Sequence, residues 1–128
     1  MQFFIHYFLH FVFPFFIAFI FFRKDWKKVY LILLATMLVD LDHLVADPIF
    51  HPNRCSINFH PLHTYYAMFV YFVFLFLRRP FNLIGMGLLF HMLTDLTDCL
   101  MTYAKCTECL SDSPALKLIQ VISTLGGI

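Results

Sequence analysis

Long runs of apolar residues, separated by short polar turns, make up most of the chain. The first run, 3–22, is interrupted only by two histidines and a proline, and it is long enough to cross a hydrocarbon core of about 30 Å. No basic residue precedes this run and no small-residue cleavage site closes it, so we expect a retained membrane helix rather than a signal peptide. The runs 29–46, 61–77 and 81–103 predict three further transmembrane helices.

Polar turns mark where these runs end. The segment 23–28 is a basic turn with one tryptophan, which is typical of a membrane interface. Proline and asparagine mark 47–59 as a loop, and Pro61 suits the first position of a helix because its missing N–H has no partner there. The segment 78–80 ends the third run. From residue 104 the chain becomes polar, and its last 15 or so residues suit a short helix on the membrane surface.

The composition agrees with this pattern. Of 128 residues, 61% are hydrophobic, 18 are phenylalanine and only 13% are charged, whereas soluble domains have about 25% charged residues. So few charges cannot cover the surface of a soluble domain of this size. The sequence therefore predicts an all-α fold, a four-transmembrane-helix membrane bundle with short loops, as a single integral membrane domain over 1–128. The net charge of +1 gives no reason to expect nucleic acid as a partner.

The two basic turns predict the orientation. Two crossings separate 23–28 from Arg78 and Arg79, so both turns lie on one side, which the positive-inside rule assigns to the cytoplasm. We expect a multi-pass protein of the cytoplasmic (inner) membrane with both termini on the outer side. Counted from the basic turns at about 1.5 Å per residue, the His and Asp side chains within the runs fall in one layer in the outer half.

The spacing of these side chains also places them on shared helix faces. His6 and His10 are four residues apart, Asp40 and His43 are three apart, and His91, Asp95 and Asp98 follow at steps of four and three. His60 and His63 flank the start of the third helix. We therefore expect four helices to bring imidazoles and carboxylates to a common height.

A metal ion is the chemistry that this set favours. An ionised carboxylate in hydrocarbon is costly unless it is paired or coordinates a cation. Several His with two or three Asp are ligands for Zn²⁺ or a related divalent ion, and their number allows one or two ions. A His/Asp site more often keeps a position open for water, whose pKa the metal lowers to about 7. The pattern predicts hydrolysis of an ester or phosphoester bond in a membrane-associated, lipid-like substrate, with the bilayer as partner.

Each candidate has an expected role. Asp42 is two residues from Asp40 and in an α-helix points away from it, so we expect it to orient a ligand or accept a proton from the water, as we do for Asp98. Either His6 or His10 can be the ligand from the first helix, and the depth of His6 favours it. His60 can cap the third helix instead of binding the metal. The expected metal ligands are His6, Asp40, His43, His60, His63, His91 and Asp95.

Three blocks of the sequence resemble a known family. Asp40-Leu41-Asp42-His43, His60 and His63 followed by Thr64, and His91-Met92-Leu93-Thr94-Asp95 are similar to the signature blocks of small inner-membrane, metal-dependent hydrolases, the YdjM-like group. The resemblance covers most of the chain, from the first to the fourth run. It implies a multi-pass membrane protein with a His/Asp metal site and hydrolase activity. Arg54 in the outer loop is a candidate clamp for phosphate or carboxylate.

Other functions use the same residues. A carrier for metal ions or protons also needs intramembrane Asp and His, although the cytoplasmic halves of the four runs hold almost no polar residue to line a pathway. A structural membrane subunit stapled by metal is a further alternative. Haem ligated by His pairs is less favoured, because Asp is a poor haem ligand. The sequence leaves the substrate and the oligomeric state open.

Four cysteines fall on the predicted outer side: Cys55, Cys99, Cys106 and Cys109. In an oxidising compartment they can form disulfides, and Cys55 with Cys99 or Cys106 with Cys109 are possible pairs. The Cys-x-x-Cys pair is also compatible with half a zinc site or a redox pair, but we favour a loop staple.

Overall fold

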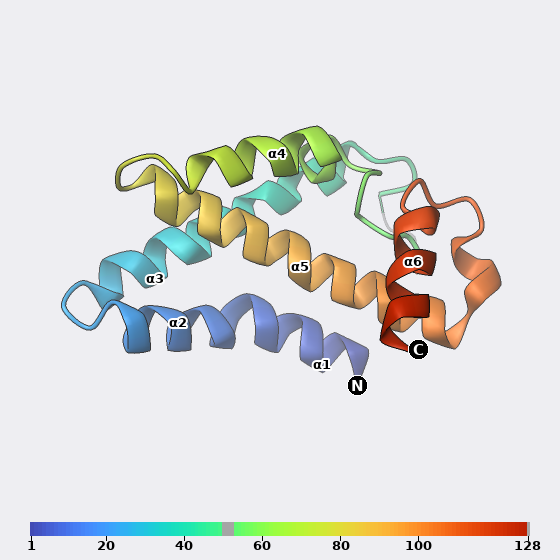
Figure 1. Cartoon of the computed structure of the whole chain (residues 1–128), viewed down its shortest axis with the longest axis horizontal. Coiled ribbons are helices and arrows are strands. Elements are labelled where there is room, and N and C mark those ends of the chain that lie inside the picture. Colours follow the sequence, from blue (N-terminus) through green and yellow to red (C-terminus); the bar gives the residue numbers. More distant parts are fainter. Residues whose placement is uncertain (50–52, 128) are drawn as a thin grey trace.

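A computed structural model describes residues 1–49 and 53–127, and within these ranges all regular structure is helical. Figure 1 shows the arrangement. The elements are α1 (Gln2–Tyr7), the π-helical turn η1 (Phe8–Val12), α2 (Phe13–Phe21), α3 (Trp26–Ala35), the 3₁₀ helices η2 (Thr36–Val45) and η3 (Pro61–His63), α4 (Tyr65–Phe74), α5 (Phe81–Lys105), the 3₁₀ helix η4 (Thr107–Leu110) and α6 (Leu116–Gly126).

Helix α5 is the centre of the bundle. It runs through the length of the molecule with α4 on one side and α1 and α2 on the other (Figure 1), and it packs against α3, α4, α1, η2 and α6. Its buried residues include His91, Asp95 and Cys99 as well as apolar ones. A helix that is covered on several sides can hold polar groups only if its neighbours supply partners.

Two glycines let α5 approach its neighbours closely. A Cβ atom at Gly85 would lie 2.7 Å from the Tyr71 carbonyl oxygen and 2.7 Å from Phe74 Cβ on α4. A Cβ atom at Gly87 would lie 2.7 Å from Thr36 Oγ1. Both contacts are too short for a side chain, so glycine sets the spacing between α5, α4 and the junction of α3 and η2. This close packing lies one to two turns before His91.

The first predicted span is a continuous helical segment with one wide turn. The π-helical turn Phe8–Val12 separates α1 from α2. Pro14 explains it, because proline has no N–H for the carbonyl of His10 and its ring crowds that carbonyl. The widened turn places the rings of His6 and His10 nearly over each other, with centroids 4.2 Å apart. Single-turn π-helical widenings are frequent at functional sites.

The second predicted span changes helix type halfway. Helix α3 ends at Ala35 and continues as the 3₁₀ helix η2. With about three residues per turn, every third side chain of η2 faces the same way. Accordingly Thr36, Val39 and Asp42 are its buried residues, and Asp42 points into the bundle although an α-helix would have turned it away from Asp40.

The third predicted span is shorter than the sequence indicates. Pro61 begins η3, as expected for a first helical position. Helix α4 begins only after Thr64, whose Oγ1 caps it by accepting a hydrogen bond from Ala67 N at 3.3 Å. The helix ends at Phe74, so at about 1.5 Å per residue it covers only about 15 Å. The fourth predicted span, in contrast, is matched by the whole of α5.

The structure contains two helical segments, Gln2–Phe21 and Phe81–Lys105, that are long and apolar enough to cross a membrane by themselves. The all-α prediction is confirmed for the described residues, whereas four membrane crossings are matched by these two candidates only. The reason lies in the second and third spans, where the change to 3₁₀ geometry and the break at Thr64 leave α-helices of 10 residues each.

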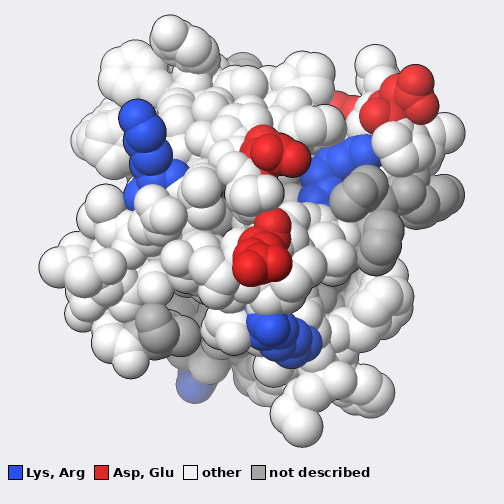
Figure 2. Space-filling model, turned by 90° about the vertical axis from the view of Figure 1, so that its right-hand side faces the viewer, with Lys and Arg blue, Asp and Glu red and all other residues white. Residues whose placement is uncertain are grey.

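The two ends of the bundle differ in character. The α2–α3 and α4–α5 turns lie together at one end, and both termini lie with α6 at the other (Figure 1). At the first end, Arg79 Nη1 lies 3.8 Å from Asp25 Oδ2 and joins the two basic turns. At the other end, acidic and basic side chains share one face (Figure 2). The predicted placement of both basic turns at one end is thus what the fold shows.

Both predicted cysteine pairs are bridged. The Cys55–Cys99 disulfide ties the loop before η3 to α5, and the Cys106–Cys109 disulfide joins the residue that precedes η4 to Cys109 within η4. The expected C-terminal helix is α6, whose Ile119 is fully buried against the rest of the molecule. These links hold the end of the bundle that carries the loops and termini.

Candidate metal centre

Four side chains from three elements converge in the interior of the bundle. Asp40 comes from η2, His63 from η3, and His91 and Asp95 from successive turns of α5. Each offers one ligand atom to a common group. His63, His91 and Asp95 are buried, while the Asp40 side chain is 39% exposed. The group is therefore enclosed on all sides except that of Asp40.

The distances within this group fit a tetrahedral metal ion. His63 Nε2 lies 3.3 Å from His91 Nε2, 3.2 Å from Asp95 Oδ2 and 3.6 Å from Asp40 Oδ1. His91 Nε2 lies 3.1 Å from Asp40 Oδ1 and 3.6 Å from Asp95 Oδ2. For metal–ligand bonds of roughly 2.0–2.1 Å, the edges of a tetrahedron are about 3.3–3.4 Å. Five of the six separations are thus close to those of a tetrahedral site, and the sixth, between Asp40 and Asp95, is at most 4.8 Å.

Asp42 sets the tautomer of His63. Its Oδ2 lies 3.0 Å from His63 Nδ1 and also accepts a hydrogen bond from the Leu62 backbone N–H at 2.8 Å. A carboxylate only accepts, so Nδ1 of His63 carries the proton and donates. The Nε2 lone pair is then directed at the group. Such a carboxylate behind a histidine is the usual support of a metal ligand.

His91 can take the same tautomer when an ion is bound. Its Nδ1 lies 3.4 Å from the sulfur of Met37, and a thioether has no proton to donate. When an ion binds Nε2, Nδ1 can therefore donate to Met37, whereas without an ion the Asp40 carboxylate, 3.1 Å from Nε2, is the stronger acceptor. With an ion bound, two nitrogen lone pairs and two carboxylates thus face one another.

A positive charge at the centre would stabilise this arrangement. Asp95 Oδ2 is buried and has no hydrogen-bond partner among the described residues, although an unsatisfied buried charge is costly. Asp40 and Asp95 together carry the charge that one divalent cation balances. The donor set, its spacing and its tautomers all fit such an ion.

A second group lies beside the first. His6, His10 and Asp95 also offer ligand atoms within reach of one another. His10 is only 3% exposed, and neither of its ring nitrogens has a hydrogen-bond partner in the described part of the chain. His10 Nε2 lies 3.8 Å from Asp95 Oδ1 and 3.9 Å from Asp40 Oδ2. The sequence favoured His6 over His10, but the structure brings both histidines to the group and buries His10 more deeply.

A third group consists of Asp42, His43 and His60. His43 is held by neighbours, with Nδ1 3.1 Å from the Asp40 carbonyl oxygen and Nε2 3.0 Å from Ser56 Oγ. Its ring stacks on His60 with centroids 3.9 Å apart. Burial and the nearby His43 lower the pKa of His60 to about 4, which keeps this imidazole neutral. Because hydrogen bonds already occupy His43, this group supports the first one rather than forming a second equally open centre.

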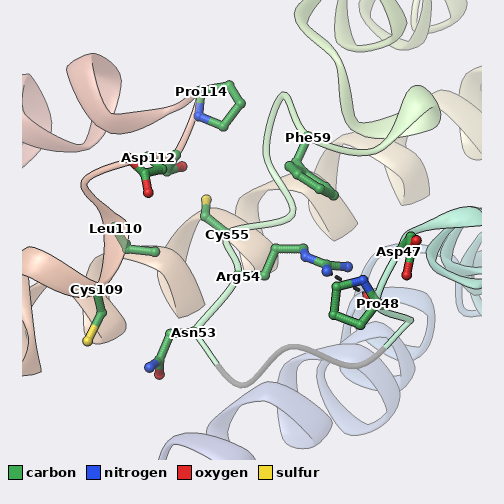
Figure 3. Close-up of a pocket in the computed structure, with 11 residues that line it drawn as sticks. Asp47, Pro48, Asn53, Arg54, Cys55, Phe59, Cys109, Leu110, Asp112 and Pro114 are labelled. Atoms are coloured by element: carbon green, nitrogen blue, oxygen red, sulfur yellow. Dashed lines mark hydrogen bonds between the residues drawn. The ribbon is translucent and has the colours of Figure 1, made fainter.

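Two further predicted residues lie elsewhere. Asp98 is in none of these groups, because it lies one turn beyond Asp95 and its Oδ1 accepts a hydrogen bond from Gln2 Nε2 at 2.9 Å. Arg54 points along a separate pocket of about 290 Å³, where it donates to the Pro48 carbonyl oxygen at 2.6 Å (Figure 3). Its guanidinium also lies 4.7 Å from the ring centroid of Phe59. None of the grouped ligands lines that pocket.

The groups that orient the candidate ligands could not be identified from the sequence. Met37, Ser56 and the Leu62 backbone N–H orient the histidines, yet no motif marks them. The placement of His10 had a signal, because Pro14 four residues later predicts a distorted turn at its carbonyl.

These features define an all-helical protein with membrane-length apolar helices and a buried His/Asp group that can hold a metal ion. The chain belongs to DUF6122, a family of unknown function, which matches residues 1–102. No curated protein and no solved structure matches the chain. The family match spans the whole centre, from His6 to Asp95, and ends before η4 and α6.

Proposed function

We propose that this protein is an integral membrane hydrolase that uses a divalent metal ion, zinc in first place, to cleave an ester or phosphoester bond of a lipid-like substrate. The observation that carries the proposal is the group of four ligand atoms from Asp40, His63, His91 and Asp95, spaced as the corners of a small tetrahedron. The three buried donors, from His63, His91 and Asp95, would leave the fourth position of the ion to be shared by the partly exposed Asp40 and the reacting water.

Each ligand has a role that its surroundings support. A bound divalent ion supplies Lewis acidity and lowers the pKa of the water that reacts. His63 and His91 hold their Nε2 atoms inward because Asp42 and Met37 accept their Nδ1 protons. Asp42 is buried and holds His63 in place, so it acts as a positioning residue. Asp40, the partly exposed carboxylate of the group, lies on the side from which the reacting water would reach the ion.

A membrane setting accounts for the surface. Large apolar side chains on the outer faces of α1, α2 and α4 are widely exposed, for example Phe4, Phe21 and Tyr66, which is unusual for a soluble monomer. We propose that lipid covers these faces and that the basic turns lie in the cytoplasm of an inner-membrane protein. The centre then lies in the outer half of the membrane, within reach of a lipid headgroup.

The resemblance to the YdjM-like hydrolases supports the same proposal. The three blocks that carry it, 40–43, 60–64 and 91–95, provide all four ligands of the tetrahedral group and the carboxylate that orients His63. Segments that are far apart in the sequence thus meet at one centre. That the three blocks contribute to one site supports the proposed function more strongly than the similarity of any single block.

A metal or proton carrier is less favoured, because its pathway would have to continue to the basic end. There, Ala18, Val29, Leu33 and Leu83 form a buried apolar cluster. Ions do not pass through a tightly packed apolar core, so the centre is accessible from one side of the bundle only.

Metal analysis and hydrolysis assays test the proposal. The purified protein in detergent should contain zinc or a related ion and should release headgroup, phosphate or fatty acid from vesicles of mixed phospholipids. Chelation should stop turnover, and Asp95→Asn should lower it at least 100-fold, whereas the matched control Asp112→Asn, on an exposed loop, should behave like the wild type. Metal without turnover on any lipid class would favour a structural subunit, and ion uptake into proteoliposomes would favour the carrier.

A further inference from the structure

His10 has no partner in a place where a buried imidazole needs one. It is almost completely buried, and both of its ring nitrogens lack hydrogen bonds within residues 1–49 and 53–127. A buried polar atom without a partner costs about 1–3 kcal/mol. The ring contacts His6 on one side, with centroids 4.2 Å apart, and His91 on the other, at 4.5 Å. Neither contact provides a hydrogen bond.

The two carboxylates of the first group each present a second oxygen to this histidine. Asp95 directs Oδ2 towards His63 and Oδ1 towards His10. Asp40 likewise directs Oδ1 towards His91 and Oδ2 towards His10. A carboxylate whose two oxygens face two sets of imidazoles is the arrangement that bridges a pair of metal ions.

We propose that His6, His10 and Asp95 bind a second divalent ion, and that Asp95, together with Asp40, bridges this ion to the one held by His63 and His91. The inference rests on the metal centre of the proposed function but not on its being a hydrolase. In protein sites with two bridged metals the ions lie about 3.5–4 Å apart, which is the width of one carboxylate bridge.

The second position is looser than the first. His10 Nε2 lies 3.8 Å from Asp95 Oδ1, compared with 3.1 to 3.6 Å for the five measured pairs of the first group. His6 is only partly buried, so fewer protein atoms enclose this ion and water completes its shell. We therefore expect weaker binding at the second position and an easily exchanged ligand there.

The second position also adjoins a polar cavity. This cavity, of about 510 Å³, is lined by His6, Gln2, Thr102 and Lys105 among others. Lys105 is the basic residue of its lining and donates to Gln2 Oε1 at 2.6 Å. Two divalent ions carry more positive charge than Asp40 and Asp95 neutralise. Asp98 in the same lining offsets the charge of Lys105, so it is the surplus charge of the two ions that favours an anionic substrate group, such as a phosphate, in this cavity.

Metal stoichiometry tests the second site directly, with ions alone as probes. After incubation with excess Zn²⁺ and removal of free ion, the wild-type full chain should hold two ions, and a chelator titration should remove them in two steps. His10→Gln should hold one ion that dissociates like the tighter of the two. His6→Ala, at a partly exposed position, should lose the weaker ion without a risk to folding. The control Asp112→Asn should hold two.

Electron paramagnetic resonance tests whether the two ions lie close together. Wild-type protein loaded with Mn²⁺ should show the spin-coupled resonance of a close pair, whereas His10→Gln should show the spectrum of an isolated ion. One ion in the wild type, or two ions in both His variants, would overturn the second site. These outcomes do not depend on turnover, so two bound ions without hydrolysis would refute the proposed reaction and leave the second site intact.

Discussion

At the scale of single residues, the centre depends on pairs in which one side chain fixes another. His63 directs its Nε2 lone pair at the group because Asp42 Oδ2 accepts a hydrogen bond from its Nδ1–H at 3.0 Å. The same oxygen of Asp42 is held by the Leu62 backbone N–H, so the carboxylate cannot turn away. This chain of contacts holds the imidazole before any ion arrives, which reduces the entropy that metal binding must overcome.

The first prediction follows from this pair. Asp42→Asn should weaken metal binding by about 10–100-fold, because the neutral amide is a weaker acceptor for the Nδ1 proton of His63 and raises the basicity of Nε2 less. The measurement is the competition of purified protein with a zinc chelator of known affinity. Asp112→Asn serves as the matched control for loss of a carboxylate. An unchanged affinity in Asp42→Asn would contradict the assigned role of Asp42.

At the scale of elements, departures from the α-helix place the ligands. The π-helical turn before Pro14 positions His10 under His6. The 3₁₀ geometry of η2 turns Asp42 inward, while Asp40 and His43, three residues apart, share the neighbouring face. In both elements an unusual turn lies where a ligand must point into the bundle.

The second prediction concerns the contact between α4 and α5. Gly85→Ala should lower the stability of the folded state by roughly 1–3 kcal/mol, because the new Cβ meets the backbone oxygen of Tyr71, which cannot move without α4. Gly87→Ala should cost less, since its Cβ meets side-chain atoms of Thr36 and Leu33 rather than backbone, while the gain of about 1 kcal/mol in helix propensity applies to both variants. Thermal unfolding in detergent, followed by Trp26 fluorescence, compares them. Equal midpoints for the two variants would refute this packing argument.

The sequence predicts which residues lie near the centre better than it predicts which of them contact one another. Hydropathy and the basic turns predict one common layer for these His and Asp residues, and the residues expected to meet, such as His63 and His91, do so. An α-helical assumption rotates successive side chains by about 100°, whereas a 3₁₀ helix rotates them by about 120°, so the direction of Asp42 could not be predicted. The partners Met37 and Ser56 depend on tertiary contacts and were also beyond prediction.

At the scale of the whole molecule, one end is basic with an apolar core, and the other holds the centre, the loops and the disulfides. Helix α3 with η2 measures about 35 Å, at about 1.5 and 2.0 Å per residue, enough for a crossing. Helix α4 is shorter, but η3 already lies at the depth of the centre, where Asp42 and Tyr71 bind the backbone N–H and carbonyl of Leu62. Non-helical backbone at membrane depth is tolerated where protein covers it. Four crossings are therefore compatible with one short helix.

The last prediction separates four crossings from two. A reporter inserted in the full chain at Lys27 or Arg79 should lie inside, because the basic turns stay in the cytoplasm. With four crossings, a reporter beside Asn53 or at the C-terminus should lie outside. Alkaline phosphatase is active outside and green fluorescent protein inside, so paired fusions give opposite signals. If only Gln2–Phe21 and Phe81–Lys105 cross, the reporter beside Asn53 should instead lie inside, while the other three remain unchanged. The Asn53 fusion alone therefore decides whether α3 with η2 and the short α4 traverse the bilayer.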